Sequence, residues 1–370
     1  MTSTDTSLFQ DRRSFLITKG DQVYWKSGDN LKPILPDGCT LLSLYYIKET
    51  NQLFIQKDKK IYLYKIDTQI LTETSIPQAQ SGETVYEEIG LYLAGQSGKN
   101  FIFTFSKYDK NSEEYKNEFA GPLPVSEKYY QYDIANNTVK DADYINEIWS
   151  LTGIASGPLS NLSLDVWDDK KNIFLGHLVG EGIGHSTPVY SVDLNNKKIT
   201  ETKQMMEAQP FFNQWGKGGD FVITKKSDEK LTLAFYDIAQ PQKEEKSYQL
   251  TIPDPIYGLS TVVWNDQKAI IVFKNQFDEL NLTTGTQREV YKDFDQAPSL
   301  ANFNWYSVNF LDNNHIIFVD WESTNKNDPI NGKHVNIIKT VDLNTNETQE
   351  IYRSISEEGS GFNLGFIVLN

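Results

Sequence analysis

The sequence contains a single cysteine, Cys39, among 370 residues, and this scarcity excludes several classes of protein. One cysteine cannot form an internal disulfide, so neither a disulfide-stapled scaffold nor a cysteine-based zinc site is expected. The four histidines, at positions 177, 185, 315 and 334, do not have the spacing of metal ligands. We therefore expect no bound metal and no cofactor.

Long hydrophobic runs are also missing. No window approaches the roughly 18 apolar residues of a membrane-spanning helix, so we expect no insertion into a membrane. The segment MTSTDTSLFQDRRS lacks the apolar core of a signal peptide, and we expect residues 1–11 to form a flexible tail. The net charge of −15, from 50 acidic and 35 basic residues, disfavours nucleic acid as a partner.

Helical periodicity is almost absent, and a repeat of short strands takes its place. Each unit has an apolar strand, a tight polar turn and a second apolar strand, as in LFIQK, FIFTF and AIIVF. A third strand ends in a recurring Asp, and a more polar fourth strand follows it. The turns are centred near Asn51, Gly98, Lys170, Gly219, Gln267 and Asn314. Four-stranded antiparallel units spaced mostly about 47–50 residues apart are typical of the blades of a β-propeller.

The two ends of the chain complement each other. SFLITK, QVYWKS and LKPIL match a second, third and fourth strand, but no first strand precedes them. The segment NLGFIVLN near the C-terminus is a lone apolar strand. Pairing it with Ser14–Lys19 would complete the blade and cover an exposed edge; packing elsewhere as an edge strand is the alternative. We therefore predict one all-β domain over residues 1–370, a seven-bladed propeller closed by its C-terminal strand.

The repeat resembles the TolB-like and WD-like propeller repeats. The segments that carry the resemblance are VYSVDLNNKKITE, FYDIAQPQKEE, LNLTTGTQREVY and TVDLNTNETQEIY. The resemblance implies the fold and leaves the activity open. Because TolB-like propellers are frequent in bacterial envelopes, it favours an extracytoplasmic or envelope location, with the cytoplasm as the alternative.

Two sets of repeated residues have a structural interpretation. The aspartates that end the third strands are expected to accept hydrogen bonds from the following turn rather than to form an acidic site. They are Asp67, Asp133, Asp193, Asp237 and Asp342, with Asn281 in the same place. Large rings before the first turns, at Trp167, Trp215, Trp264 and Phe310, are expected to pack between blades rather than to form a binding ring.

Departures from the repeat indicate where function lies. Long connections are expected at 108–128, 180–188 and 322–333, in the third, fourth and seventh blades, and at 143–161 between the third and fourth blades. Irregular loops on a rigid scaffold are common places for function. The candidate partner-binding residues in or beside these connections are Tyr108, Tyr115, Phe119, Trp149, His185 and Trp321.

No catalytic motif is present in the sequence. There is no G-x-S-x-G, P-loop or H-E-x-x-H segment, so no catalytic residue is predicted. We expect a monomeric, non-catalytic propeller that binds another protein, such as an envelope or complex component, through the face with the long loops. The alternative is a propeller that binds or processes glycans at the mouth of its central channel.

Overall fold

The computed structural model describes the greater part of the chain. The described residues are 15–27, 30–116, 122–152, 160–180, 189–201, 208–212, 221–227, 230–253, 259–273, 276–292, 308–323, 334–355 and 364–369. Phe119, His185 and the expected tail at 1–11 lie outside these ranges. No helix among the described residues has the length and apolarity needed to cross a bilayer.

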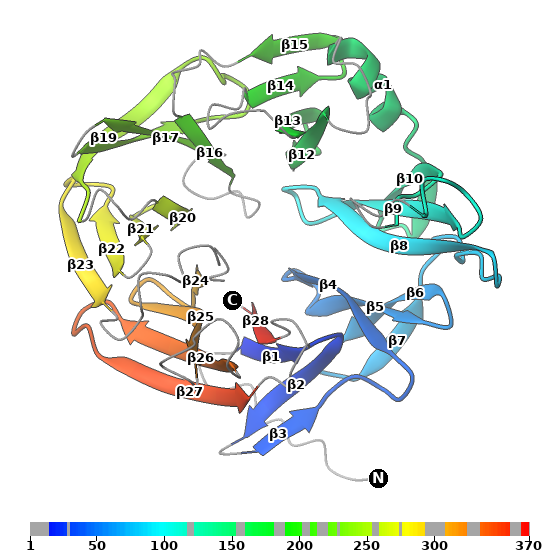
Figure 1. Cartoon of the computed structure of the whole chain (residues 1–370), viewed down its shortest axis with the longest axis horizontal. Helices are drawn as coiled ribbons and strands as arrows, with labels where there is room; N and C mark the ends of the chain where they lie inside the picture. The colour runs from blue at the N-terminus through cyan, green and yellow to red at the C-terminus, as the bar shows by residue number, and fades with distance from the viewer. Residues whose placement is uncertain are drawn as a thin grey trace. The chain divides into compact units, whose positions relative to one another are not determined.

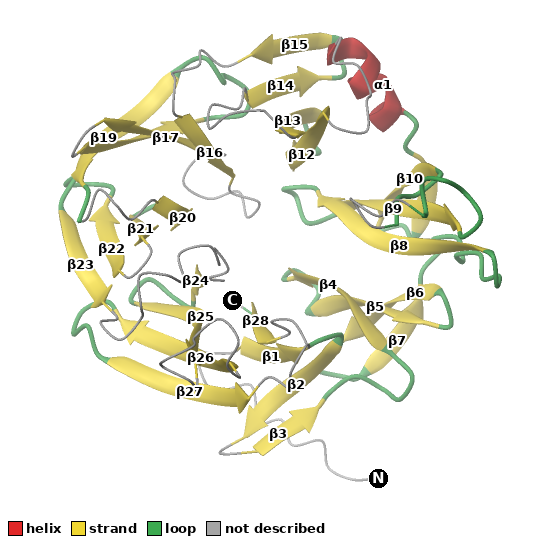
Figure 2. Ribbon diagram, in the orientation of Figure 1, coloured by secondary structure: helices red, strands yellow, loops and turns green. Residues whose placement is uncertain are grey.

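The strands form seven four-stranded antiparallel sheets, and the chain is a seven-bladed β-propeller, as predicted (Figures 1 and 2). Blades 2 to 5 belong to one compact unit, Pro36–Ile252, and blades 1, 6 and 7 to a second unit. Blade 1 contains β28 (Leu364–Val368), β1 (Phe15–Lys19), β2 (Gln22–Ser27) and β3 (Asn30–Pro33). Blade 2 contains β4 (Thr40–Ile47), β5 (Gln52–Lys57), β6 (Lys60–Lys65) and β7 (Ile70–Glu73). Blade 3 contains β8 (Val85–Ala94), β9 (Asn100–Asp109), β10 (Ser126–Asp133) and β11 (Thr138–Asp141).

The remaining blades repeat the same order along the chain. Blade 4 contains β12 (Ser160–Asp168), β13 (Ile173–Gly180), β14 (Val189–Asp193) and β15 (Lys198–Glu201). Blade 5 contains β16 (Ala208–Phe212), β17 (Phe221–Ser227), β18 (Lys230–Tyr236) and β19 (Glu244–Thr251). Blade 6 contains β20 (Leu259–Trp264), β21 (Lys268–Phe273), β22 (Gln276–Asn281) and β23 (Gln287–Lys292). Blade 7 contains β24 (Val308–Phe310), β25 (His315–Ser323), β26 (His334–Asp342) and β27 (Thr348–Ile355).

One expectation about the long connections is corrected. The segment 143–161, expected as an irregular loop, contains helix α1 (Tyr144–Thr152) between β11 and β12 (Figure 2). Ile145 and Ile148 of α1 are fully buried in the core shared by blades 3 and 4. Residues three apart lie on one face of a helix. Burial of this apolar face stabilises α1, a helix so short that its propensity alone would make it only marginally stable.

Apolar cores fill the spaces between neighbouring blades within each unit. Phe54 of blade 2 meets Phe101 and Phe103 of blade 3 edge-to-face, with ring centroids 4.8 and 5.1 Å apart. The central strands are apolar on both faces because a neighbouring blade covers each face, which explains their continuous hydrophobic sequences. Trp167 is 2% exposed and lies in the core shared by blades 3 and 4, so its predicted packing role is confirmed. Trp264 is buried, at 7% exposed, and Trp215 lies outside the described residues.

Four of the five turn aspartates, together with Asn281, accept turn hydrogen bonds as predicted. Asp133 Oδ1 accepts hydrogen bonds from the backbone N–H of Ala135 and Asn136, at 2.9 and 3.3 Å. Asp193, Asp237, Asn281 and Asp342 accept equivalent bonds from their own turns. Side-chain hydrogen bonds from Asn136 and Asn196, followed by backbone N–H bonds, lower the pKa of Asp133 and Asp193.

The C-terminal strand completes blade 1, as predicted. β28 pairs antiparallel with β1 in a register that runs from Phe15 opposite Val368 to Lys19 opposite Leu364. Phe366 and Ile367 are 9% and 2% exposed. Phe366 and Ile17 belong to an apolar core that includes Ile317 and Ile338 of blade 7. The last strand therefore supplies both backbone pairing and buried apolar area.

Replacing Ile367 by Ala is expected to destabilise the protein by about 2–5 kcal/mol, because a buried side chain is truncated in a strand that completes a blade. Denaturant unfolding followed by circular dichroism measures this change. Ile70→Ala is the matched control, since Ile70 is 55% exposed and its truncation is expected to change stability by less than about 0.5 kcal/mol. Equal effects of the two substitutions would contradict the role assigned to β28.

The capped turns predict a loss of stability in acid. A carboxyl group whose pKa is lowered on folding stabilises the fold above its unfolded pKa, near 3.8, and this contribution is lost as the pH falls through the lower folded value. Replacing Asp133 and Asp193 together by Asn keeps an acceptor oxygen, as Asn281 has, but removes the titration. The urea midpoint of this variant is therefore expected to fall less between pH 5 and pH 2.5 than that of the parent. If the urea midpoints of the parent and the variant fell equally between pH 5 and pH 2.5, Asp133 and Asp193 would not contribute to the loss of stability in acid.

Candidate functional site

The predicted partner-binding residues divide into three groups. Tyr108 is the last residue but one of β9, and Tyr115 lies in the connection that follows this strand; their ring centroids are 6.4 Å apart. Trp149 lies on α1 and Trp321 on β25, and for both only the backbone is described. Phe119 and His185, as noted, are not among the described residues. The structure thus brings together Tyr108 and Tyr115, and their function stays a prediction.

A third tyrosine, which the sequence analysis missed, completes this pair. The register places Tyr86 of β8 directly opposite Tyr108, and the two rings stack at 5.2 Å. Tyr115 meets both rings edge-on, and Lys110 Nζ lies 5.7 Å from the Tyr86 ring centroid. A hydrogen bond with Tyr115, and then desolvation, raises the pKa of Tyr86 to about 12. The three rings form a tyrosine cluster at one end of blade 3.

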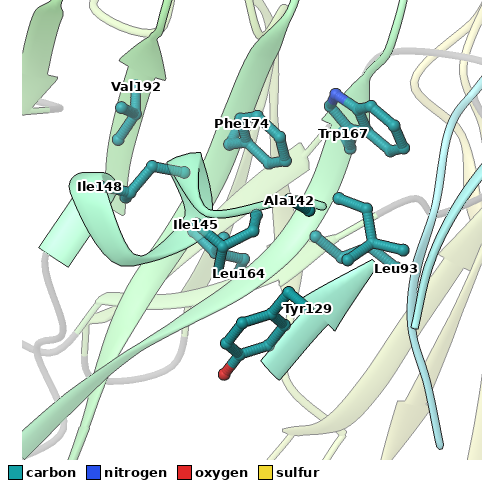
Figure 3. Packing of buried hydrophobic residues seen from close by; sticks show 10 residues of the cluster. Leu93, Tyr129, Ala142, Ile145, Ile148, Leu164, Trp167, Phe174 and Val192 are labelled. Atoms are coloured by element: carbon teal, nitrogen blue, oxygen red, sulfur yellow. The ribbon is translucent and has the colours of Figure 1, made fainter. Parts of the chain in front are cut away.

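Next to the tyrosine cluster, hydroxyl groups hold the carboxylate of Glu127. Glu127, on β10, lies opposite Ser106 of β9. Ser106 Oγ donates to Glu127 Oε1 at 3.1 Å, and the Tyr129 hydroxyl donates to Oε2 at 2.9 Å. Figure 3 shows the Tyr129 hydroxyl pointing away from the apolar side chains that surround its ring. Burial, and then the nearby Glu127, raises the pKa of Tyr129, so this phenol stays neutral and can donate its one proton to Glu127.

Blade 4 contributes a histidine and an aspartate to the same boundary. His177 Nδ1 lies 2.6 Å from Asp165 Oδ2, and the two side chains are 24% and 16% exposed. Tyr92 of β8 connects this pair to Glu127. Its ring centroid lies 5.1 Å from that of Tyr129, and its pKa is raised by burial first and then by the carboxylates of Asp165 and Glu127. The site therefore combines Tyr92, Glu127, Tyr129, Asp165 and His177 from two adjacent blades.

Two β-bulges aim side chains at this site. In β8 the register shifts between Leu91 and Leu93, and Tyr92 is the extra residue. In β12 it shifts between Leu164 and Val166, and Asp165 is the extra residue. Bulges turn a side chain away from the regular alternation and are common next to functional sites. These bulges could not be predicted from the sequence, because a shift of one residue leaves the apolar pattern on either side intact.

A polar latch fixes the boundary between blades 3 and 4. Asp169, in the first turn of blade 4, accepts hydrogen bonds from Ser97 N at 2.9 Å and Asn100 Nδ2 at 2.8 Å, and a further one from Ser97 Oγ. A Cβ atom added to Gly95 would lie 2.5 Å from the Asp169 side chain, so glycine is needed for this approach. Gly95 also forms a bridge to Trp167. The latch sets the relative position of the strands that carry the site.

Among the described residues, no group of three or more His, Cys, Asp or Glu side chains is placed to hold a metal ion. The chemistry that the site offers comes from its own ionisable groups. One carboxylate is held by neutral hydroxyls, a second is paired with an imidazole, and two phenols with raised pKa lie between them. Such a set can donate and accept protons and can hydrogen-bond a polar substrate.

No family model matches the sequence, and no curated protein matches it either. Several solved structures are similar in fold. Prolyl endopeptidases share 11% identity with a TM-score of 0.51, covering 93% of this chain and 47% of theirs. Porphyromonas gingivalis dipeptidyl peptidase 4 shares 9% identity with a TM-score of 0.48, covering 90% and 48%. An oligogalacturonate lyase in complex with manganese shares 9% identity with a TM-score of 0.47, covering 91% and 86%. The chain thus spans about half the length of the two peptidases.

These comparisons correct the expected function. The chain was expected to be a non-catalytic scaffold, whereas its fold also occurs in prolyl endopeptidases. The prediction of a non-enzyme is corrected, because it rested on missing catalytic motifs and this fold is found in enzymes as well. At these identities the likeness shows the fold alone, and at that level the resemblance to propeller repeats is confirmed.

Replacing Asp169 by Ala is expected to destabilise the chain by about 2 kcal/mol, because hydrogen bonds to a charged acceptor are lost at a partly buried boundary. Thermal and urea unfolding measure the loss. Asp266→Ala is the matched control, since Asp266 is exposed at the corresponding place in the turn after Trp264 and its removal is expected to be nearly neutral. A near-neutral Asp169→Ala would show that the latch does not hold the boundary.

Proposed function

We propose that this chain is the propeller of an enzyme that acts on peptides, and that the site between blades 3 and 4 receives the substrate. The likeness in fold to prolyl endopeptidases supports the choice of peptides. Those proteins are about twice as long as the part that matches, so their activity is a proposal for this chain.

The observation that carries the proposal is the Glu127 carboxylate held beside the tyrosine cluster. Two hydroxyl donors fix its oxygens, and the side chain itself is exposed. An exposed carboxylate in a fixed position is an acceptor for peptide N–H groups or for a peptide ammonium group, and charge-assisted hydrogen bonds of this kind are strong. The adjacent rings of Tyr86, Tyr108 and Tyr115 offer apolar surface to peptide side chains.

The protein's acidity is consistent with this substrate. A net charge of −15 raises the local concentration of basic peptides and lowers that of acidic ones. The expected envelope location, protein partner and monomeric state stay predictions beside this proposal.

A mixed-sequence library of short fluorescent peptides tests the proposal, with binding followed by anisotropy and cleavage by mass spectrometry. The chain is expected to retain a subset of peptides enriched in Lys and Arg. Glu127→Gln is expected to weaken their binding about tenfold through loss of a charge-assisted acceptor. Glu350→Gln, in an exposed pair with Arg353 at 2.6 Å, is the control and is expected to bind as the parent does. No peptide retained, or equal binding by both variants, would refute the proposal.

A further inference from the structure

We infer that the face of blade 3 that carries Glu88 and Glu127 binds the guanidinium group of an arginine side chain in a peptide. This assignment rests on the proposed function for its choice of a peptide as the ligand. It goes further in two respects. It adds Glu88 to the site, and it separates arginine from lysine, which carries the same charge.

The register of blade 3 places two acidic side chains in one row across three strands. Glu88 of β8 lies opposite Ser106 of β9, and Ser106 lies opposite Glu127 of β10. Residues directly opposite each other in an antiparallel sheet point to the same face. Glu88 and Glu127 are both exposed, and the small side chain of Ser106 lies between them. Because neighbouring strands are about 4.8 Å apart, the two glutamates start about 10 Å apart and can converge on one ligand.

These two carboxylates lack a cationic partner in the part of the chain that the structure describes. Neither Glu88 nor Glu127 forms an ion pair there, and the two hydrogen bonds that Glu127 accepts come from neutral hydroxyls. Lys107 and Lys128, the next residues along β9 and β10, point to the opposite face of the sheet. Two like charges in one row repel each other, and a cation bound between them relieves the repulsion.

The tyrosine cluster lies on the same face, beside the acidic row. Tyr86 and Tyr108 lie opposite each other, and each is two residues away from the row along its strand, so both rings point to the side of the sheet that carries the glutamates. Burial, and then the carboxylates of Glu88 and Glu127, raises the pKa of Tyr108. Both carboxylates therefore lie close to this ring. Aromatic faces attract cations, and the neighbouring carboxylates add to that attraction.

The chain already places one cation on this cluster. Lys110 Nζ lies 5.7 Å from the centroid of the Tyr86 ring, and Lys110 follows directly after the last residue of β9. This contact shows that the cluster accepts a positive group. Lys110 is exposed, so its side chain can leave the ring when another cation arrives. Lys110 is thus a competitor of the ligand within the chain itself.

A buried hydroxyl on the same face also indicates a bound polar group. Thr104, two residues from Ser106 along β9, lies opposite Gly90 of β8. The Thr104 hydroxyl oxygen is buried and has no hydrogen-bond partner among the described residues. A Cβ atom added to Gly90 would meet, of those residues, only the methyl group of Thr104, at 3.5 Å. Buried hydroxyls are normally satisfied, and a polar group of the peptide can complete this one.

Arginine suits this face better than lysine does. A guanidinium group is planar and has five N–H donors, so it can donate to two carboxylates and stack on an aromatic ring at the same time. An ammonium group is a compact, strongly hydrated point charge that gains less from the second carboxylate and from the ring. The row of two glutamates beside the tyrosine rings therefore favours arginine.

Binding of three short peptides by the full chain tests this inference. The peptides have blocked ends and differ only at the central residue, which is arginine, lysine or citrulline. Anisotropy of a fluorescent label is followed at about 0.15 M salt, which screens exposed charges more than about 8 Å apart. The arginine peptide is expected to bind about tenfold more tightly than the lysine peptide. Citrulline resembles arginine in shape but has no charge, and its peptide is expected to bind more weakly than both.

Three variants assign the effect to this face. Glu88→Gln is expected to weaken binding of the arginine peptide about tenfold, to the level of the lysine peptide. Glu87→Gln is the matched control, because it removes the same charge one residue away on the opposite face of β8, and it is expected to bind as the parent does. Lys110→Met is expected to strengthen binding a few-fold, because it frees the Tyr86 ring. Circular dichroism checks that each variant is folded.

Equal affinity of the parent for the arginine and lysine peptides would overturn the inference, as would equal weakening by Glu88→Gln and Glu87→Gln. A Lys110→Met variant that binds the arginine peptide more weakly than the parent would also overturn it. If peptides are retained and cleaved with no preference for arginine, this inference alone fails. If the arginine peptide binds in a manner that depends on Glu88 but no peptide is cleaved, the proposed enzyme alone fails.

Discussion

The antiparallel pairing of β28 with β1 is the contact on which blade 1 depends. Without it, β1 would be an edge strand with open backbone groups, and the buried Ile17 would lose its neighbour Phe366. The other blades are each built from one continuous run of chain, so only blade 1 relies on a pairing between residues about 350 positions apart. Closing so long a loop is costly in entropy, and the backbone ladder and the apolar core shared with blade 7 offset that cost together.

Blades 3 to 7 share one kind of hydrogen-bonded hairpin turn. An Asp or Asn at the end of a strand accepts N–H groups from the next few residues, as Asp133, Asp168 and Asn265 do. Because this hydrogen bonding is local, it leaves the strands free to differ in their outward residues. That freedom permits blades 3 and 4 to carry Glu127, Asp165 and His177.

Much of the fold could be predicted from the sequence because it depends on short-range patterns. Strand order, blade number and the fate of the C-terminal strand follow from apolar runs and turn residues that recur at a fixed spacing. The site could not be predicted in the same way. Asp165 and His177 are 12 positions apart in sequence and meet only because of a bulge, and Tyr92 meets Tyr129 only through the folding of three strands. The helix α1 was missed because its burial, rather than its propensity, stabilises it.

The register of β28 on β1 has a mechanical consequence. Phe15, the first residue of β1, lies opposite Val368, the last residue of β28, so chain segments leaving these two residues do so from the same end of the ladder. A force that pulls Phe15 and Val368 apart would break the hydrogen bonds between β1 and β28 one pair after another, starting at this end of the ladder. It would not load all of these hydrogen bonds at the same time. Blade 1 is thus poorly suited to bear tension applied between Phe15 and Val368.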